Sequence, residues 1–293
     1  MISVNPEESS MATAVLLISC PDRTGIVHAV TGFVLSHGGN ILDLEQHVDP
    51  AQGWFFMRLE WSLENFLLPR EAIHDSFRHL AEHMQMDWEL RFTGTPTRIA
   101  LFVTRDSHCF FDIMSRIECG EWQAQVPLII SNREDLRHAA ERYGLPFHCI
   151  PVTSDTKQEA EEKQDALLRA AGVNLIVLAR YMQVLSPWII ERWREKVINI
   201  HHSFLPAFAG AKPYHAAHSR GVKIIGATAH YVTEELDEGP IIEQDVARVS
   251  HRETVEELVR LGKDVEKIVL ARAIAAHLEH RVLAWRKRTV VFS

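Results

Sequence analysis

The chain has 293 residues, of which 46% are hydrophobic and 24% are charged, and its formal net charge at pH 7 is −8. This length suffices for one large domain or two ordinary ones, and the composition is typical of a globular protein with a full core. The only dense basic run, Arg286–Arg288, lies near the C-terminal end, so the acidic balance argues against nucleic acid as the main partner.

The distribution of cysteines and of apolar segments indicates in which cellular compartment the protein is expected. The four cysteines are scattered and form no Cys-x-x-Cys pair, which predicts free thiols in a reducing environment. The first residues lack a basic flank followed by a long apolar stretch, so they do not resemble a signal peptide. No segment approaches the ~20 apolar residues of a membrane span. We therefore expect a cytoplasmic protein without a membrane partner.

Residues 12–92 predict a first domain with the element order βαββαβ, which is a ferredoxin-like arrangement. Gly38 and Gly39 end the first expected helix, and the turn Asp49–Gly53 joins two strands as a hairpin. The polar segment Thr93–Thr97 is typical of a linker. The expected strands cover residues 12–19, 41–48, 54–61 and 88–92, and the expected helices cover residues 26–37 and 68–84.

From residue 98 onward strands alternate with helices, which predicts a second α/β domain over residues 98–293 with a doubly wound, mostly parallel sheet. The segment Val173–Ala179 is apolar throughout, as in a strand that is buried on both faces. The expected strands are 98–104, 126–131, 173–179, 197–201, 224–232 and 241–249. The expected helices are 110–118, 133–143, 156–171, 188–194 and 252–280, with a break in the last one near Gly262.

A strand and a turn of this domain present an amide, an imidazole and a carboxylate. Asn199 and His201 alternate in the expected strand 197–201, so their side chains project from the same face. Asp237 lies in an acidic turn between two apolar strands. The amide can hold a carbonyl oxygen, the imidazole can share its developing charge, and the carboxylate can orient a base or a water. This pattern predicts an acyl-transfer site that needs neither a metal nor a covalent intermediate.

Three motifs resemble those of the folate-dependent formyltransferase family: residues 199–208 (Asn-Ile-His-His-Ser-Phe-Leu-Pro-Ala-Phe), 226–233 (Gly-Ala-Thr-Ala-His-Tyr-Val-Thr) and 235–242 (Glu-Leu-Asp-Glu-Gly-Pro-Ile-Ile). The resemblance implies 10-formyltetrahydrofolate as the substrate, no tightly bound cofactor, and catalytic roles for Asn199, His201 and Asp237. It also suggests that His230 supports Asp237 or positions the substrate. The alternative that His230 only packs in its strand stays open.

Residues 178–187 resemble the folate-binding loop of the same family, which implies substrate contacts from residues within it: Arg180, Tyr181, Met182, Val184 and Leu185. For Arg180, a contact with a nearby carboxylate is an equal alternative. Lys212, Tyr214 and His215 are expected at the rim of the site, near the glutamate tail of the folate or over the attacking water, and a packing role is the alternative. His215 and His218 are three residues apart, but no third ligand follows at a recognisable spacing, so we expect no metal.

The N-terminal domain is similar to the ACT family of small-molecule sensor domains in residues 20–27 and 38–41. The resemblance implies a homo-oligomer, because ACT sheets commonly join side by side, and an amino-acid effector at the interface between subunits. The expected effector site combines the turn Asp22, Arg23, Thr24 and Gly25 with Asn40. A plain helix-entry turn is the alternative.

An ACT domain ahead of a formyltransferase-like domain resembles enzymes that hydrolyse 10-formyltetrahydrofolate to formate and tetrahydrofolate, which supply formate for purine synthesis and balance the one-carbon pool. Relatives that formylate a phosphorylated glycinamide carry a glycine-rich phosphate loop after the first strand of the domain. Here no glycine lies between Gly94 and Gly120, although a phosphate cradle needs unhindered backbone N–H groups. Water is therefore the expected acceptor; a formyltransferase with an amine acceptor and a non-catalytic folate sensor are the alternatives.

Overall fold

The structure is a computed structural model that describes residues 12–206 and 213–293. It divides the chain into two compact units. The N-terminal unit contains the described residues up to Pro96 together with two C-terminal segments, His280–Trp285 and Val290–Ser293. The larger unit contains Thr97–Glu279 and Arg286–Thr289.

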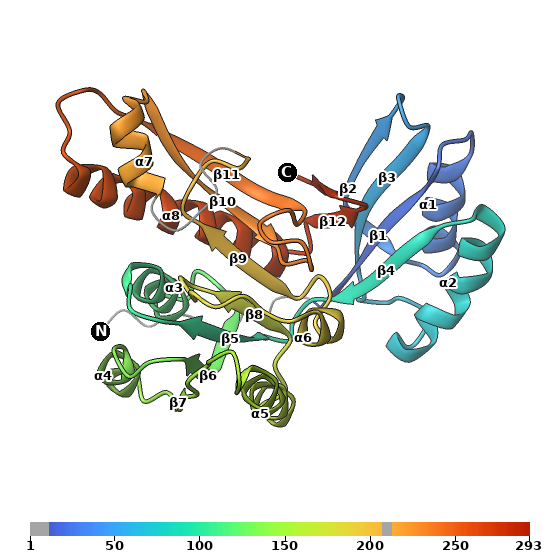
Figure 1. Cartoon of the computed structure of the whole chain (residues 1–293). Helices are drawn as coiled ribbons and strands as arrows, with labels where there is room; N and C mark the ends of the chain where they lie inside the picture. The colour runs from blue at the N-terminus through green and yellow to red at the C-terminus, as the bar shows by residue number, and fades with distance from the viewer. Residues whose placement is uncertain (1–11, 207–212) are drawn as a thin grey trace, which may run out of the picture. The chain divides into compact units, whose positions relative to one another are not determined.

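The N-terminal unit is an antiparallel sheet of four strands with two helices on one of its faces (Figure 1). Its elements are β1 (Thr13–Pro21), α1 (Ile26–Ser36), β2 (Asn40–Asp49), β3 (Trp54–Ser62), α2 (Arg70–Met84) and β4 (Asp87–Phe92). The strand order β2-β3-β1-β4 and the element order confirm the expected βαββαβ fold. The apolar stripes of the helices, which include Val30, Val34, Ile73 and Phe77, form one core with the sheet.

The C-terminal segments of this unit supply a second apolar cluster. Leu283 and Phe292 pack with Leu17 of β1 and Phe56 of β3, and all four side chains are buried. Leu283 lies in β12 (Val282–Trp285), which pairs with β13 (Arg288–Val291). The sequence analysis did not predict these two strands.

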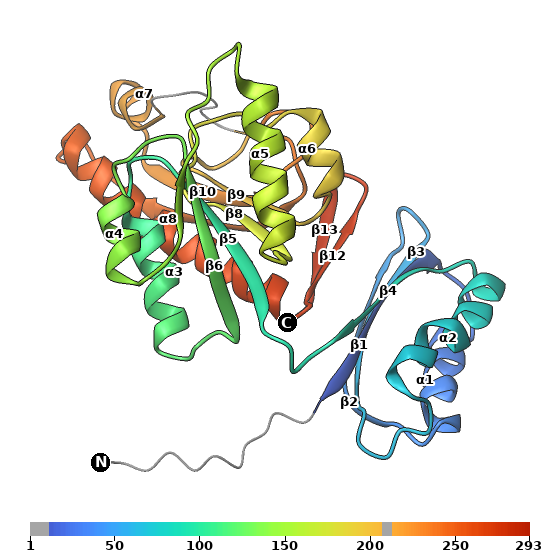
Figure 2. The same cartoon turned by 90° about the horizontal axis from the view of Figure 1, so that it is seen from below.

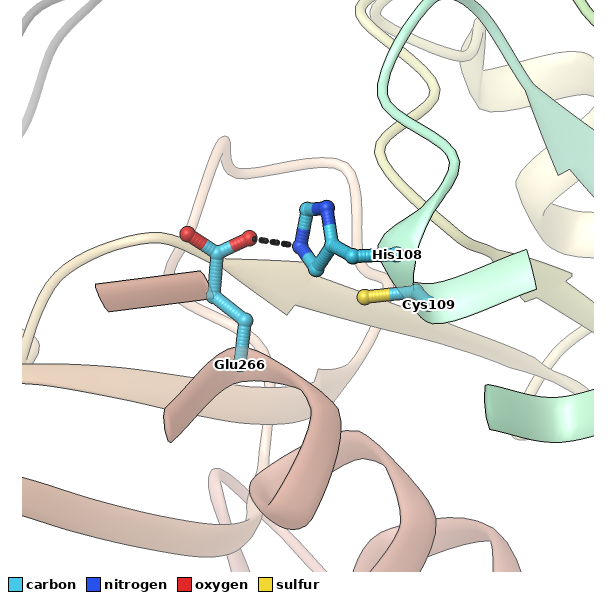
Figure 3. Close-up of side chains that lie close together, drawn as sticks. All are labelled: His108, Cys109 and Glu266. Atoms are coloured by element: carbon cyan, nitrogen blue, oxygen red, sulfur yellow. Dashed lines mark hydrogen bonds and ion pairs between the residues drawn. The ribbon is translucent and has the colours of Figure 1, made fainter. Parts of the chain in front are cut away.

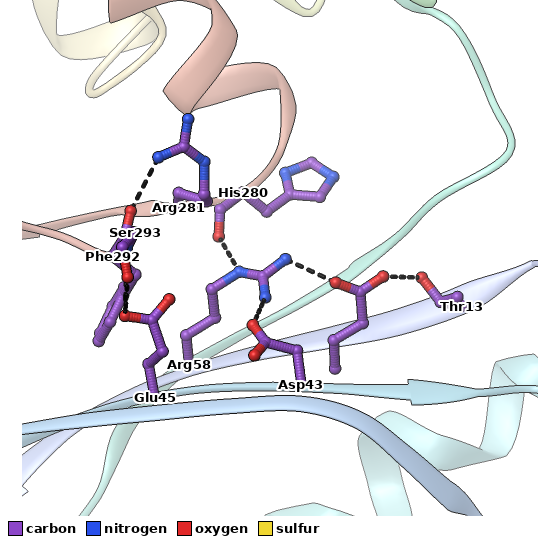
Figure 4. A network of polar contacts seen from close by, with 9 residues as sticks. Thr13, Asp43, Glu45, Arg58, His280, Arg281, Phe292 and Ser293 are labelled. Atoms are coloured by element: carbon purple, nitrogen blue, oxygen red, sulfur yellow. Dashed lines mark hydrogen bonds and ion pairs between the residues drawn. The ribbon is translucent and has the colours of Figure 1, made fainter.

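A buried arginine adds polar contacts to the same region (Figure 4). The Arg58 guanidinium donates to Asp43 Oδ2 at 2.7 Å and to Glu60 Oε2 at 2.6 Å, while its Nε donates to the backbone oxygen of His280 at 3.1 Å. The backbone N–H of Ser293 donates to Glu45 Oε2 at 3.1 Å. Because charge-assisted hydrogen bonds are directional, they fix the last residues of the chain to the sheet.

The larger unit is built on a seven-stranded sheet with the order β11-β10-β9-β8-β5-β6-β7. Its strands are β5 (Thr97–Val103), β6 (Ala124–Ser131), β7 (Phe147–Cys149), β8 (Leu175–Leu178), β9 (Val197–His201), β10 (Ile224–Tyr231) and β11 (Ile241–Arg248). Its helices are α3 (His108–Glu118), α4 (Arg137–Arg142), α5 (Lys157–Ala170), α6 (Pro187–Arg192), α7 (Pro213–Arg220) and α8 (Val255–Leu278). Strands β5 to β9 are parallel to one another, and β10 runs antiparallel to both of its neighbours, β9 and β11.

The connections of the parallel strands explain why helices cover both faces of this sheet. The chain runs outward from β5 through β6 to β7, then returns to β8 beside β5 and continues to β9. Because such crossovers are right-handed, α3 lies on one face, together with α8, and α5 and α6 lie on the other (Figure 2). The direction of winding changes between β5 and β8, and open α/β sheets bind their ligands at the carboxyl ends of strands at such a switch point.

The structure confirms the expected order of long elements but corrects several details. The short elements β7 and α7 were not predicted. Helix α8 runs without interruption from Val255 to Leu278, so the expected break near Gly262 is wrong. The helix also ends before His280, where the chain enters the N-terminal unit.

We predict that Phe292→Ala lowers the unfolding free energy of the N-terminal unit by about 3–5 kcal/mol, because it empties a buried aromatic position. Urea unfolding followed by tryptophan fluorescence measures the change. The matched control is Val291→Ala at the preceding, exposed position, which should stay within about 0.5 kcal/mol of the wild type. Equal effects of the two substitutions would show that the cluster around Phe292 does not stabilise the unit.

Candidate active site

Two paired strands place three polar side chains together. Strands β9 and β10 are antiparallel, with Asn199 opposite His230 and His201 opposite Thr228. Directly opposed residues project from the same face of a sheet. Asn199 and His201 therefore share a face, as the alternation in the sequence predicted, and His230 joins them. The Asn199 Nδ2 atom lies 3.3 Å from His230 Nε2.

The turn after β10 brings a carboxylate to this face. Asp237 has a left-handed backbone conformation with φ 58°, which aspartate tolerates better than most residues. Two residues later, a Cβ on Gly239 would lie 1.7 Å from the backbone oxygen of Tyr231. Only glycine therefore lets the turn approach β10 so closely, and this approach sets the place of Asp237.

The Asp237 carboxylate faces two imidazoles. Its Oδ2 lies 3.2 Å from His201 Nδ1, and its Oδ1 lies 3.7 Å from His230 Nε2. The hydrogen bond from His201, followed by the influence of the nearby His230 imidazole, holds the pKa of Asp237 well below its ordinary value, although burial opposes this shift. Asp237 is thus an ionised carboxylate at neutral pH.

The hydrogen bonds leave two nitrogen groups available for a ligand. His201 Nδ1 donates to Asp237, and its buried Nε2 has no partner among the described residues. His230 Nδ1 donates to the backbone oxygen of Tyr231 at 2.9 Å, so the His230 Nε2 accepts from the Asn199 amide. An amide nitrogen carries two hydrogens, and the second one remains for a carbonyl oxygen. The site can therefore hold an oxygen while an imidazole takes up a proton.

The segment expected to bind folate follows β8 at the switch point. Tyr181 and Leu185 are buried, and the Tyr181 hydroxyl accepts a hydrogen bond from Gln164 Nε2 at 3.3 Å. Met182 and Val184 are 50% and 55% exposed, so these two apolar side chains are the ones that a ligand can reach. The backbone N–H of Met182 donates to Thr104 Oγ1 at 3.1 Å, which ties the segment to the end of β5.

Arg180 in this segment is part of a partly buried ionic network. Its Nη2 donates to Asp106 Oδ2 at 3.3 Å, and its Nε lies 3.5 Å from Glu266 Oε2 without the geometry of a hydrogen bond. Lys263 Nζ donates to Asp106 Oδ1 at 2.8 Å. The sequence analysis left open whether Arg180 meets the substrate or a nearby carboxylate, and the structure places its guanidinium beside the carboxylates of Asp106, which follows β5, and Glu266 on α8.

Glu266 on α8 is the centre of this network. Its Oε2 accepts from His108 Nε2 at 2.8 Å, and its Oε1 accepts from the Tyr214 hydroxyl at 2.6 Å. Burial opposes ionisation, but these bonds and the charge of Arg180 hold the pKa of Glu266 below its ordinary value. Neither Glu266 nor His108 was predicted, because nothing in the polar sequence of α8 indicates that one of its glutamates is buried.

The same cluster contains the one set of side chains within the described ranges whose donor atoms could surround a metal: His108, Cys109 and Glu266, with ligand atoms within 4.8 Å of one another (Figure 3). Both oxygens of Glu266 already accept hydrogen bonds, and the Arg180 cation lies beside them. Burial, followed by the charge of Glu266, raises the pKa of the Cys109 thiol, which disfavours the thiolate that a metal requires. The charges of this cluster are thus compensated within the protein.

The three expected rim residues are Lys212, Tyr214 and His215, in and just before α7. His215 is exposed on this helix, whereas Lys212 lies outside the described residues. Tyr214, between them in the chain, is buried. Among the described residues, His215 forms no hydrogen bond or ion pair with Asn199, His201 or Asp237.

In the N-terminal unit, the residues expected to bind an effector are all exposed. Gly25 is the N-cap of α1 with φ 91°, and Arg23 donates to the backbone oxygen of His83 at 3.3 Å. Asn40 is the first residue of β2. Separately, none of the helices in the part of the chain that the structure describes is long and apolar enough to cross a membrane.

Comparisons with known proteins agree with this geometry. A family model described as formyl transferase matches residues 97–274, and the ACT domain model matches residues 14–60. A formyltetrahydrofolate deformylase from Synechocystis sp. is 50% identical over 281 residues, which cover 96% of this chain and 99% of the relative.

Two solved structures are similar over nearly the whole chain. The crystal structure of a formyltetrahydrofolate deformylase from Pseudomonas syringae pv. tomato has a TM-score of 0.94 and 46% identity, and covers 98% of this chain and 96% of its own. The corresponding structure from Burkholderia mallei has a TM-score of 0.89 and 43% identity, and the match covers 96% of this chain and 99% of the Burkholderia chain.

We predict that His202, which follows β9, destabilises the protein in acid. Burial, together with the positive charges of Arg180 and His201, lowers the pKa of His202 from 6.5 to about 4. Between these pH values the unfolded chain binds more protons, so the free energy of unfolding falls as the pH falls. His202→Gln should make this dependence less steep in urea unfolding at pH 4.5, 5.5, 6.5 and 7.5. The exposed His138 provides the control His138→Gln, and a slope altered equally by both would refute the assignment.

Proposed function

The chain belongs to the formyltetrahydrofolate deformylase family and hydrolyses 10-formyltetrahydrofolate to formate and tetrahydrofolate, and we propose that Asn199, His201 and Asp237 perform this reaction. The observation that carries the proposal is the short contact between His201 Nδ1 and the Asp237 carboxylate, which leaves the buried His201 Nε2 without a partner among the described residues.

In the proposed reaction, His201 acts as the base. A water attacks the formyl carbon and gives a proton to His201 Nε2, and the imidazolium that forms is stabilised by Asp237. The tetrahedral oxyanion is held by the free N–H of the Asn199 amide and by the charge on His201. The bond from the carbon to N10 then breaks, N10 takes up the proton, and formate leaves. In this scheme the protein activates the water by itself, so the proposal includes no metal.

His230 has a supporting role in this scheme. Its Nδ1 is committed to the backbone of Tyr231, and its Nε2 faces both Asn199 and Asp237. It thereby orients the amide that holds the oxyanion. An interaction with the substrate itself is not required for this role.

We propose that the pterin of the substrate lies against the exposed Met182 and Val184 beside the switch point. The buried Tyr181 and Leu185, together with the largely buried Arg180, support this segment from the protein side. Lys212 and His215 are proposed for the rim of the site, where a cationic side chain suits the glutamate tail of a folate.

We propose an amino-acid effector for the ACT domain, bound by Asp22, Arg23, Thr24 and Gly25 together with Asn40 in a homo-oligomer. The exposure of these residues supports a site that a second subunit completes. The four free cysteines fit a reducing compartment, so we place the enzyme in the cytoplasm, where its formate supplies purine synthesis.

Asp237→Asn is expected to lower kcat for formate release by about 10²–10³-fold, because the amide cannot stabilise the imidazolium that forms on His201. Formate is measured with purified enzyme and 10-formyltetrahydrofolate, with no added amine. The control is Glu235→Gln at an exposed position of the same turn, which should leave kcat unchanged. Retention of wild-type activity by Asp237→Asn would remove the carboxylate from the mechanism.

A panel of the free amino acids should contain at least one that changes the rate of formate release. Asn40→Ala is expected to raise the half-maximal concentration of this effector about fivefold, which corresponds to the loss of one hydrogen bond of about 1 kcal/mol. Glu71→Gln, at an exposed position of α2, should leave the response unaltered. If no amino acid alters the rate, the effector proposal fails.

A further inference from the structure

Helix α8 contains a glycine at an interior position where glycine is unfavourable. Gly262 costs the helix about 1 kcal/mol relative to alanine, yet α8 continues through it. A Cβ at this position would lie 2.1 Å from the hydroxyl oxygen of Tyr214 and 2.2 Å from its Cζ. The missing side chain therefore makes room for the end of the Tyr214 ring.

Tyr214 is held in this place by a buried hydrogen bond. Its hydroxyl donates to Glu266 Oε1 at 2.6 Å, one helical turn after Gly262 on the same helix. The Tyr214 side chain is buried, and burial, followed by the charge of Glu266, raises its pKa far above the ordinary value. The hydroxyl is thus a permanent donor, and the ring has one well-defined position.

The Glu266 carboxylate is fixed in turn by two further groups, one from α3 and one from the segment after β8. His108 at the start of α3 donates to it at 2.8 Å, and Arg180 after β8 lies 3.5 Å away. Arg180 also reaches Asp106 after β5. Because these groups come from the carboxyl ends of β5 and β8, Tyr214 is anchored to the same edge of the sheet as the catalytic residues.

The ring of Tyr214 connects this anchor to the catalytic histidine through His202. The Tyr214 and His202 ring centroids are 6.2 Å apart, and those of His202 and His201 are 5.1 Å apart, with tilts of 50° and 36°. His201 then contacts Asp237 at 3.2 Å. His202 is buried between Tyr214 and His201, so a shift of the tyrosine ring must be taken up by the two histidines.

We propose that Tyr214, seated over Gly262 and bonded to Glu266, is a positioning residue of the hydrolysis: it holds His202, and through it the His201 ring, in the orientation in which Nε2 meets the attacking water. Tyr214 does not touch the substrate in this role. The inference rests on the proposed role of His201 as the base. It explains why α8 has a glycine at position 262 and why an ionic network surrounds Glu266, since the hydrolysis mechanism itself requires neither feature.

The test is Gly262→Ala, which inserts a methyl group against Tyr214 and changes no polar group. A misplacement of catalytic groups by about 1 Å costs on the order of 10²-fold in rate, so kcat should fall by about 10–100-fold while KM stays within about twofold. Gly32 in α1 offers the matched control, because a Cβ there would meet nothing within 4 Å and its backbone is not left-handed. Gly32→Ala should leave kcat unchanged.

Tyr214→Phe is the second variant, and it keeps the ring while removing the bond to Glu266. It should also lower kcat without raising KM, and it serves as the test if Gly262→Ala does not fold. Circular dichroism and thermal unfolding verify that each variant is folded. The proposal would be overturned if either folded variant had the kcat of the wild type, whether or not its KM was raised.

A double-mutant cycle shows whether the glycine acts through the tyrosine. In a Tyr214→Ala background the methyl group of Gly262→Ala meets no ring, so it should cause no further loss of kcat. An equal loss in both backgrounds would overturn the proposal.

The variant His201→Ala separates this inference from the function on which it rests. If His201→Ala retains wild-type kcat, the proposed role of His201 fails. If His201→Ala is inactive and Gly262→Ala is unaffected, only the positioning role of Tyr214 fails.

Discussion

The hydrogen bond from His201 to the Asp237 carboxylate is the interaction on which the site depends. It brings together a strand and a turn that are 36 positions apart in the chain, and it decides which nitrogen of the imidazole is free to act. The neighbouring His230 faces the same carboxylate and the Asn199 amide. These hydrogen bonds therefore explain why the polar groups tolerate burial and why their hydrogen-bonding directions are fixed.

Two glycines allow the approaches that this arrangement needs. At Gly239 a Cβ would collide with the backbone of β10, and at Gly262 it would collide with the ring of Tyr214. The first glycine sets the turn that presents Asp237, and the second makes room for the residue that we infer to hold His202. At both positions the absence of a side chain lets a neighbouring group lie closer to the site. The conformational freedom of glycine alone would not explain why glycine occurs there.

The long elements and the three catalytic candidates could be predicted from the sequence, because period-2 and period-3.6 patterns and the alternation of Asn199 and His201 are local signals. The four-residue strand β12 and the three-residue β7 are too short to carry such a period. The burial of Glu266 could not be predicted from the sequence either, because its partners come from α3, α7 and the end of β8. Gly262 was noticed but interpreted as a helix break, because the clash that it avoids exists only in the folded chain.

The most direct test of the central claim is a crystal structure with a non-hydrolysable analogue of 10-formyltetrahydrofolate. The account predicts that the carbon corresponding to the formyl group lies within about 3–3.5 Å of an ordered water that hydrogen-bonds to His201 Nε2. The oxygen on that carbon should accept a hydrogen bond from Asn199 Nδ2. An analogue bound with this carbon away from His201, or with Asp237 turned from the imidazole, would contradict it.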